Sequence, residues 1–248
     1  MSLTVHQFPC LSDNYGFLVR DDATGKTATI DTPDADAILA ELDKLGWTLD
    51  LILNTHWHPD HAGGNAAIKA ATGAAIVGPQ EVTRIAPLDR VVVDGDVVEL
   101  GETRFGVIDT GGHTLGHIAF YDAADAVAFV GDTLFALGCG RLFEGTAEQM
   151  WTSLGKLTAL PDATTVYCAH EYTASNARFA LSVDEDAAVK ARTDQVFAAR
   201  ERGEPTVPTS IGLEKATNPF LRAPLLRPGL EPAQAFAQIR AAKDEFKG

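Results

Sequence analysis

Short apolar runs separated by Gly, Asp and Asn fill the first two-thirds of the chain. They predict a β-hairpin over 17–30 and a buried strand over 51–53, a run too short for a helix. Further strands are predicted at 75–77, 91–93, 97–100, 105–108, 118–121, 126–130 and 164–168. Strands mixed with helices on this scale predict a layered α/β or α+β domain.

Apolar residues repeat instead at helical spacing in five stretches. The predicted helices cover 35–45, 65–71, 148–160, 187–200 and 231–247, with Asn65 as the N-cap of the second. No strand pattern persists beyond Thr173, and 203–209, which holds two prolines, is expected to be a connector. We therefore predict two domains, a metallo-hydrolase domain over 1–173 and a helical substrate-binding domain over 174–248.

Composition narrows the class of protein. The 248 residues carry a formal net charge of −14, which disfavours nucleic acid as a partner. The chain has three cysteines, and an odd number without a C-x-x-C pair indicates a reducing compartment. The N-terminus lacks a secretory pattern, and no stretch approaches the ~20 apolar residues of a membrane span. We expect a soluble cytoplasmic monomer that binds no membrane.

Six of the seven histidines fall in three contexts that each follow a predicted strand. The first is Thr-His-Trp-His-Pro-Asp-His at residues 55–61. In an extended segment His56 and His58 point the same way, and a turn into a helix near Asp60 lets Asp60 and His61 face a second point. Four ligands exceed the needs of one tetrahedral ion with an open position, which suggests two ions. The alternative is a chance histidine cluster on a solvated loop.

The other two contexts add ligands from further along the chain. His113 and His117 lie in the glycine-rich segment 111–117, and His170 follows the strand predicted over 164–168. Asp132 follows the strand at 126–130, where a carboxylate can bridge two cations. Taken alone, Asp132 fits a turn or helix cap and His170 a packed or surface histidine. Their significance lies in the combination.

This set of motifs resembles the metallo-β-lactamase superfamily. The segments 55–61, 112–114, 131–132 and His170 carry the resemblance, which covers about residues 15–172. It implies an αββα sandwich, in the α+β class, with the metals at one sheet edge and a small C-terminal α-helical domain. Within the superfamily the chain is most similar to the glyoxalase II (hydroxyacylglutathione hydrolase) family, through 11–15, 138–146, 169–173 and the tail 239–247.

The resemblance implies a role for each site residue. One divalent ion would be held by His56, His58 and His113, the other by Asp60, His61 and His170, with Asp132 bridging both; Asp60 and Asp132 are also assigned to catalysis. His117 would support the site without ligating. Arg141, Phe143, Tyr172, Arg240 and Lys243 would bind glutathione, although Phe143 stands where some members have tyrosine.

The tail also indicates such a role without the resemblance. On a helix Arg240, Lys243 and Lys247 share one face, which would suit an anionic ligand. The alternative is a solvated amphipathic helix with ordinary cations, and Arg141 could likewise be a surface charge. Cys139 and Cys168 lie near the motifs and are expected to be small buried residues.

The activity that the resemblance implies is hydrolysis of S-(2-hydroxyacyl)glutathione by a hydroxide bridging two metal ions, as in methylglyoxal detoxification. Zinc is the expected metal, and iron and manganese suit the same ligands. The alternatives are a mononuclear-iron persulfide dioxygenase of the same superfamily and a non-catalytic module with a structural metal. Segment 138–146 and the helical tail argue against the first, and seven candidate ligands argue against a closed structural site.

Overall fold

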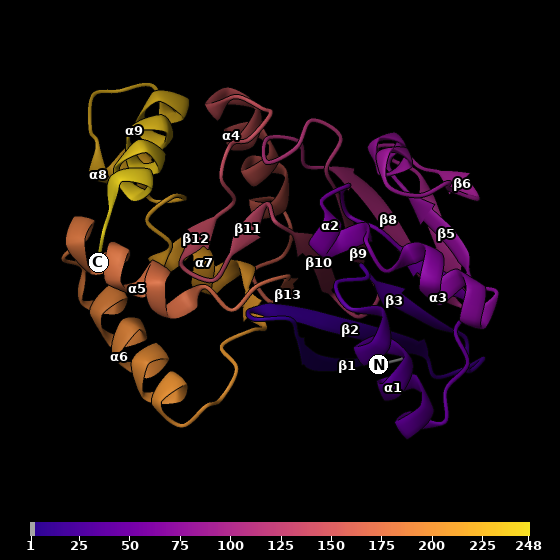
Figure 1. Ribbon diagram of the computed structural model, residues 1–248. Helices are drawn as coiled ribbons and strands as arrows, with labels where there is room; N and C mark the ends of the chain where they lie inside the picture. Colours follow the sequence, from indigo (N-terminus) through magenta and orange to yellow (C-terminus); the bar gives the residue numbers. More distant parts are fainter. Residues whose placement is uncertain (1–2) are drawn as a thin grey trace. The chain divides into compact units, whose positions relative to one another are not determined.

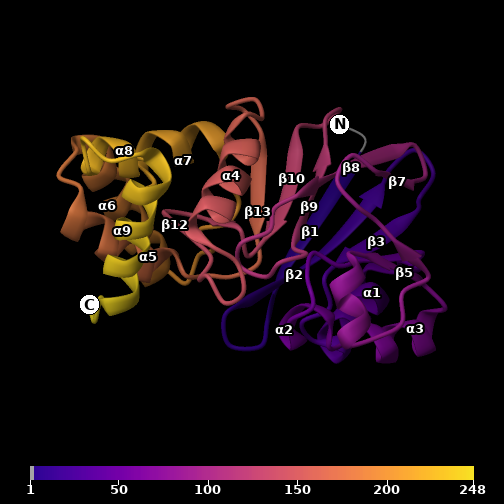
Figure 2. The ribbon, with the colours of Figure 1, turned by 90° about the horizontal axis from the view of Figure 1, so that it is seen from above.

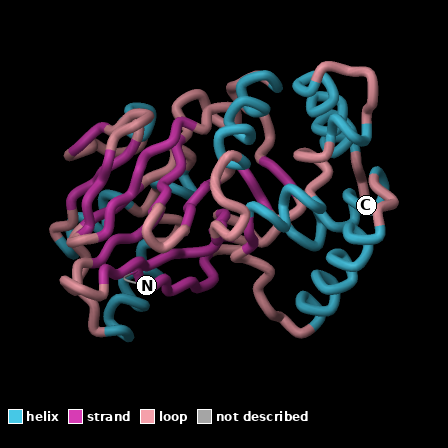
Figure 3. The backbone as a smooth tube through the Cα atoms, turned by 180° about the vertical axis from the view of Figure 1, so that it is seen from behind, coloured by secondary structure: helices cyan, strands magenta, loops and turns pink. Residues whose placement is uncertain are grey.

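The computed structural model describes residues 3–248, which divide into two compact units. The first unit comprises the chain up to Asp109 together with Gly116–Gly131, and the second comprises Thr110–Leu115 and Asp132–Gly248. Strands predominate in the first unit and helices in the second, as the ribbon and tube show (Figures 1 and 3). The predicted division of the chain at residue 173 stays a prediction.

One sheet of the first unit is mixed. Its strands lie in sequence order, with β1 to β3 antiparallel and β3 to β6 parallel. They are β1 (Leu3–Cys10), β2 (Asn14–Asp21), β3 (Thr27–Ile30), β4 (Leu51–Leu53), β5 (Ala75–Gly78) and β6 (Arg90–Val91). The parallel part explains why 51–53 and 75–77 are short, continuous apolar runs, since such strands are buried on both faces.

Helices cover one face of this sheet (Figure 2). They are α1 (Ala35–Leu45), α2 (Pro59–Ala62) and α3 (Asn65–Thr72), and η1 (Gln80–Arg84) follows β5. The Asp34 carboxylate accepts a hydrogen bond of 3.1 Å from the Ala37 amide and so caps α1. Ile38 of α1 and Ile68 of α3 are fully buried against Ile52 and Ile76 of the sheet. This apolar layer holds the end of β4 in place.

The other strands of the first unit form an antiparallel ladder. It consists of β7 (Val97–Leu100), β8 (Thr103–Asp109), β9 (Ile118–Asp122) and β10 (Val127–Gly131). Phe129 of β10 packs edge-on against Phe17 of β2, with ring centroids 5.7 Å apart, and against Phe105 of β8. The two sheets of this unit therefore share an aromatic core.

The second unit is built mainly from helices. They are α4 (Ala147–Thr158), α5 (Thr173–Val183), α6 (Ala187–Glu201), α7 (Ile211–Thr217), α8 (Ala223–Leu226) and α9 (Pro232–Glu245). Two small ladders accompany them, β11 (Leu134–Phe135) with β12 (Gly138–Cys139), and β13 (Thr165–Cys168) with β14 (Thr209–Ser210). The rings of Trp151, Phe236, Phe220 and Phe179 follow one another at 5.8 to 6.2 Å and join α4, α9 and α5.

Most predicted elements are confirmed, and the differences are local. The strands β1, β11, β12 and β14 and the helices α2, α5, α7 and α8 were not predicted, and β14 is a strand beyond Thr173. Asn65 is the first residue of α3 and not its N-cap, which is Gly64. In residues 3–248 no helix is both long and apolar enough to cross a membrane.

Candidate metal centre and substrate pocket

The histidine motif of the first unit joins the end of β4 to the start of α2. His58 is the N-cap of α2 and Pro59 its first residue, so the chain turns into a helix at Asp60, the condition under which Asp60 and His61 can face a second point. His56 Nε2 lies 3.0 Å from His58 Nδ1, and Asp60 Oδ2 lies 3.7 Å from His61 Nε2. The motif thus presents its imidazoles and carboxylate as two close pairs.

Asp31, which the sequence analysis missed, orients two residues of this motif. Its Oδ2 lies 2.8 Å from His61 Nδ1 and accepts a 2.8 Å hydrogen bond from Thr55 Oγ1. The Thr55 amide donates to Asp31 Oδ1, and Thr55 Oγ1 lies 3.0 Å from His56 Nδ1. With Nδ1 facing Asp31, Nε2 is the His61 atom that can ligate a cation. The only sequence signal for Asp31 is that it directly follows a strand.

The backbone of His61 is also held. Its carbonyl accepts hydrogen bonds of 2.7 Å from the Thr32 amide and 2.9 Å from Asn54 Nδ2. Asn65, buried at the start of α3, donates to Asn54 Oδ1 at 2.7 Å and accepts from Thr32 Oγ1 at 2.8 Å. The side chain predicted to cap a helix instead completes a buried polar network that fixes the motif.

His117, which directly precedes β9, packs against the histidine motif. It is fully buried, and its ring stacks on that of His56 with centroids 4.7 Å apart. Gly131, with a φ of 48°, ends β10 beside it, where an added Cβ would lie 2.7 Å from His117 Nε2 and 2.6 Å from Thr55 Oγ1. Only glycine fits this position without displacing a histidine or its partner.

In the second unit Asp132 lies between two histidines. Its Oδ2 is 3.4 Å from His113 Nε2, and its Oδ1 is 3.4 Å from His170 Nε2. His113 Nδ1 donates to the Arg141 carbonyl at 2.8 Å, which leaves Nε2 as the atom that can ligate. One carboxylate therefore places a separate oxygen beside each imidazole, the arrangement expected of a bridging ligand.

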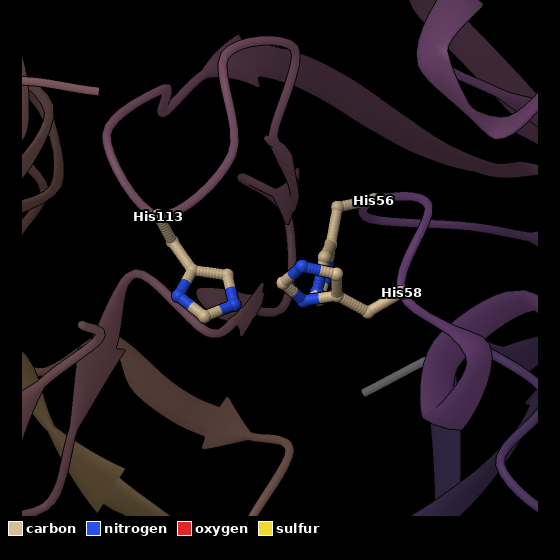
Figure 4. A group of neighbouring side chains, drawn as sticks. All are labelled: His56, His58 and His113. Carbon is tan, nitrogen blue, oxygen red and sulfur yellow. Dashed lines mark hydrogen bonds between the residues drawn. The ribbon is translucent and has the colours of Figure 1, made fainter. Parts of the chain in front are cut away.

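The seven predicted ligands fall into three groups whose ligand atoms lie within 4.8 Å of one another. The groups are His56, His58 and His113 (Figure 4); His56, His61 and Asp132; and Asp60, His61 and His170. Zinc–nitrogen bonds of about 2.0–2.1 Å put two tetrahedral ligands roughly 3.4 Å apart. Atoms this close, with imidazole and carboxylate as donors, fit first-row divalent cations.

A pocket of about 480 Å³ lies within the second unit. All five residues predicted to bind substrate line it, namely Arg141, Phe143, Tyr172, Arg240 and Lys243, and so do His113 and Asp132. Tyr172 is 38% exposed and its ring stacks on His170 at 4.6 Å, while Phe143 is 62% exposed and meets His113 edge-on at 5.2 Å. The pocket therefore brings a cationic wall and an aromatic wall to the candidate ligands.

The two cationic side chains that α9 brings to the pocket have different hydrogen-bond partners. Arg240, 5% exposed, donates from Nη1 to the Cys139 carbonyl and from Nη2 to Asp244 Oδ1, both at 2.9 Å. Lys243 Nζ donates to the carbonyl and the hydroxyl of Ser175, both at 3.1 Å. Both positions on α9 thus point into the pocket, as helical spacing predicts.

Electrostatics make this pocket suited to an anion. The pKa of Lys243 is lowered to about 8, first by burial and then by the neighbouring cations Arg240, Arg178 and Arg141, while Asp244 opposes the shift. Because these cations repel one another, a negatively charged ligand would relieve the repulsion and bind favourably. Burial also raises the pKa of Cys139 to about 11 and that of Cys168 to about 12, and both are small buried residues, as the sequence predicts.

Solved structures of related proteins share this fold. ETHE1 from Myxococcus xanthus matches with a TM-score of 0.72 and 29% identity, over 96% of this chain and 90% of that one. TTHA1623, solved in a di-iron-bound form, matches with a TM-score of 0.64 and 25% identity over 88% of this chain and 100% of that one. With the family matches, they confirm the predicted α+β class and metallo-β-lactamase-like sandwich with a C-terminal helical domain.

Sequence comparison gives the family. Two curated relatives, from Erythrobacter litoralis and Maricaulis maris, are both named hydroxyacylglutathione hydrolase. The first is 55% identical over 98% of this chain and 100% of its own length. The second is 56% identical over 98% of this chain and 99% of its own length. Residues 17–170 match the metallo-beta-lactamase superfamily, and residues 171–246 match the hydroxyacylglutathione hydrolase C-terminus. The chain belongs to the hydroxyacylglutathione hydrolase family of the metallo-beta-lactamase superfamily.

Proposed function

We propose that this protein hydrolyses S-(2-hydroxyacyl)glutathione thioesters, converting S-D-lactoylglutathione to D-lactate and glutathione in methylglyoxal detoxification. The observation that carries the proposal is the pocket of the second unit, where three cationic side chains lie in the same cavity as His113 and Asp132. A glutathione thioester has carboxylates at one end and a reactive carbonyl at the other. The match of residues 171–246 to the hydroxyacylglutathione hydrolase C-terminus supports this substrate over a persulfide.

Two divalent cations per chain are the proposed cofactors, with zinc first and iron or manganese as substitutes. His56, His58 and His113 would hold one, Asp60, His61 and His170 the other, and Asp132 both. The three compact ligand groups support this assignment, as does the di-iron-bound form of the related TTHA1623. When bound, such ions supply a water of lowered pKa and polarise a carbonyl.

The chain's own residues would bind and orient the substrate. Arg141, Arg240 and Lys243 would oppose the carboxylates of the glutathione part, and Tyr172 and Phe143 would pack beside it. Asp132 would keep the imidazole rings of His113 and His170 in the positions needed to ligate the ions. Because the leaving thiolate belongs to a thiol with a pKa of about 8.5, the reaction needs no strong general acid. A water activated by the bound ions would be the nucleophile, so no serine or cysteine nucleophile is required.

Three further expectations belong to the same proposal. We expect the protein to act as a monomer in the cytoplasm, without a nucleic acid or membrane partner. The net charge of −14 supports the exclusion of nucleic acid, and three buried free cysteines support a reducing compartment.

The test is the loss of S-D-lactoylglutathione thioester absorbance with purified protein, alongside elemental analysis for metal. We expect hydrolysis with about two metals per chain, and we expect both the activity and the metal to be lost in Asp132→Ala. Metal retained without thioester hydrolysis would reject the glutathione assignment and redirect the search to oxygen consumption with glutathione persulfide and to other thioesters.

A further inference from the structure

The turn between β11 and β12 has an unfavourable backbone that other residues must hold. Leu137 is fully buried and has a φ of 57°, a left-handed conformation that is unfavourable for a non-glycine residue. The ladder itself is short, with only Leu134 opposite Cys139 and Phe135 opposite Gly138. Two residue pairs are too few to keep such a turn in one conformation.

Three side chains hold this turn through its backbone. Asn218 Nδ2 donates to the carbonyls of Phe135 at 3.2 Å and Gly138 at 2.9 Å. Asn176 Nδ2 donates to the Ala136 carbonyl at 3.1 Å, and the Leu137 amide donates to Glu214 Oε2 at 2.9 Å. Every residue of 135–138 is therefore held by a side chain from α5, α7 or the end of α7.

Glu214 is in turn fixed by a buried network. It is fully buried, and its Oε2 also accepts a 2.9 Å hydrogen bond from Asn218 Nδ2. Its Oε1 accepts from Arg192 Nη2 and from Thr209 Oγ1, and Arg192, only 6% exposed, reaches Thr217 Oγ1 through Nη1. Buried ion pairs add little net stability because both charges lose their hydration. The network is therefore better explained by the fixed position that it gives the Glu214 carboxylate than by added stability.

The turn carries one wall of the substrate pocket. Phe135 and Cys139 line the pocket, and the Cys139 carbonyl accepts the 2.9 Å hydrogen bond from Arg240. The Phe135 ring meets the rings of His170 and Tyr172 edge-on, at 6.0 and 5.5 Å. A shift of 135–139 would therefore move Arg240 and Tyr172 together.

We propose that Asn218 and Glu214 are positioning residues for the substrate. Through the turn at 135–138 they set where Arg240 and Tyr172 stand, and so determine the affinity for the glutathione part of the thioester. Neither residue lines the pocket itself, and both are fully buried. This inference rests on the proposed function for its substrate, but its structural part concerns the turn alone.

The test compares Asn218→Ala with Leu157→Ala, a substitution of a fully buried residue of α4 that does not line the pocket. Asn218→Ala keeps Glu214 and its ion pair but removes the donor to two carbonyls of the turn. We expect its KM for S-D-lactoylglutathione to rise about tenfold with kcat nearly unchanged. Leu157→Ala is expected to lower the melting temperature without this change in KM.

A second measurement follows the turn without any substrate. The three cysteines are buried free thiols, so their modification by a thiol reagent, mapped by mass spectrometry, reports local opening. In Asn218→Ala we expect Cys139 to react about tenfold faster relative to Cys10, which lies in β1 of the first unit. If Asn218→Ala does not fold, Asn218→Ser, which removes the same amide, takes its place.

The outcomes separate the two proposals. Wild-type protein that does not hydrolyse the thioester rejects the proposed function, and Cys139 reactivity then decides whether Asn218 fixes the turn. A variant with unchanged KM and with Cys139 no more reactive than in Leu157→Ala overturns the positioning role. A raised KM and a selectively reactive Cys139 support it.

Discussion

A single carboxylate, Asp31, links the two halves of the histidine motif in the first unit. It contacts both His61 Nδ1 and Thr55 Oγ1 at 2.8 Å, and Thr55 contacts His56. A carboxylate behind a ligating imidazole fixes its tautomer and makes it a stronger ligand. We expect Asp31→Ala to lower metal affinity by about 10- to 100-fold, measured as metal retained against a competing chelator.

The control for this change is Asp21→Ala. Asp21 is also a fully buried carboxylate of the first unit, and it accepts hydrogen bonds from Thr24, Thr103 and Glu102. Its loss should lower the melting temperature while metal affinity stays that of the wild type. Equal metal retention in the two variants would show that Asp31 contributes only to folding.

Lys243 should give the substrate affinity a pH dependence near neutrality. Its pKa lies at about 8, lowered first by burial and then by neighbouring cations. The ammonium attracts a carboxylate below that pH and loses its charge above it, so kcat/KM should fall as pH rises through about 8. We expect a loss on the order of tenfold by pH ~9.5, measured in buffers of constant ionic strength.

Lys243→Arg is the matched variant, because a guanidinium keeps its charge throughout this range. It should remove the alkaline decline while retaining most of the activity at pH ~7. A decline that persists unchanged in Lys243→Arg would assign the titration to another group.

At the residue scale, the sequence identifies the candidate ligands more readily than the residues that position them. The candidate ligands of 55–61 are local in sequence, and the strand-end positions of His113, Asp132 and His170 can be read from apolar runs. Asp31, Asn54 and Asn65 act through side-chain hydrogen bonds between separate segments. An Asp or Asn after a strand is also common in turns, so its type alone does not identify this role.

Among the elements, α4 supports the loop that carries His113. Gly112 has a φ of 145°, and a Cβ there would lie 2.9 Å from Met150 Cα. Ser153 Oγ donates to the Gly111 carbonyl at 2.6 Å, and the Gly145 amide donates to the Gly112 carbonyl. We expect Gly112→Ala to destabilise the protein by roughly 2 kcal/mol or more and to reduce bound metal, as measured by thermal unfolding and elemental analysis.

Gly155→Ala provides the comparison within the same helix. Gly155 is exposed in α4, and an added Cβ would meet nothing within 4 Å. Alanine there should stabilise the protein by about 0.5–1 kcal/mol through its better helix propensity. Similar unfolding temperatures for the two variants would contradict the close packing of Gly112 on α4.

Several of the elements missed by sequence have identifiable physical reasons. Pro9 disfavours a strand, yet β1 tolerates it because β1 lies at a sheet edge, where an amide donor can be absent. The strand β14 has only two residues and exists through pairing with β13. The helices α7 and α8 are too short for a periodicity to emerge. Long amphipathic elements such as α1 and α4 were predicted because their apolar spacing is itself local.

For the whole molecule, the distribution of charge matters more than its sum. The chain carries a net charge of −14, which repels an anionic substrate at long range. The pocket nevertheless gathers Arg141, Arg240 and Lys243, and Arg178 is near enough to affect Lys243. The local positive field selects the binding face, while the negative charge of the rest of the protein resists non-specific association with polyanions.

This charge distribution predicts the response to salt. A Debye length of about 10 Å at 0.1 M falls to roughly 3 Å at 1 M, so added salt should screen the attraction between the pocket and the glutathione carboxylates. We expect kcat/KM to fall several-fold between ~0.02 and ~0.5 M NaCl, mainly through KM.

Arg141→Gln should lower kcat/KM at low salt and flatten this dependence. Lys190→Gln, which removes an exposed cation of α6 that does not line the pocket, should leave the slope unchanged. If both variants keep the wild-type slope, the salt effect arises elsewhere, and the cationic wall contributes only short-range contacts.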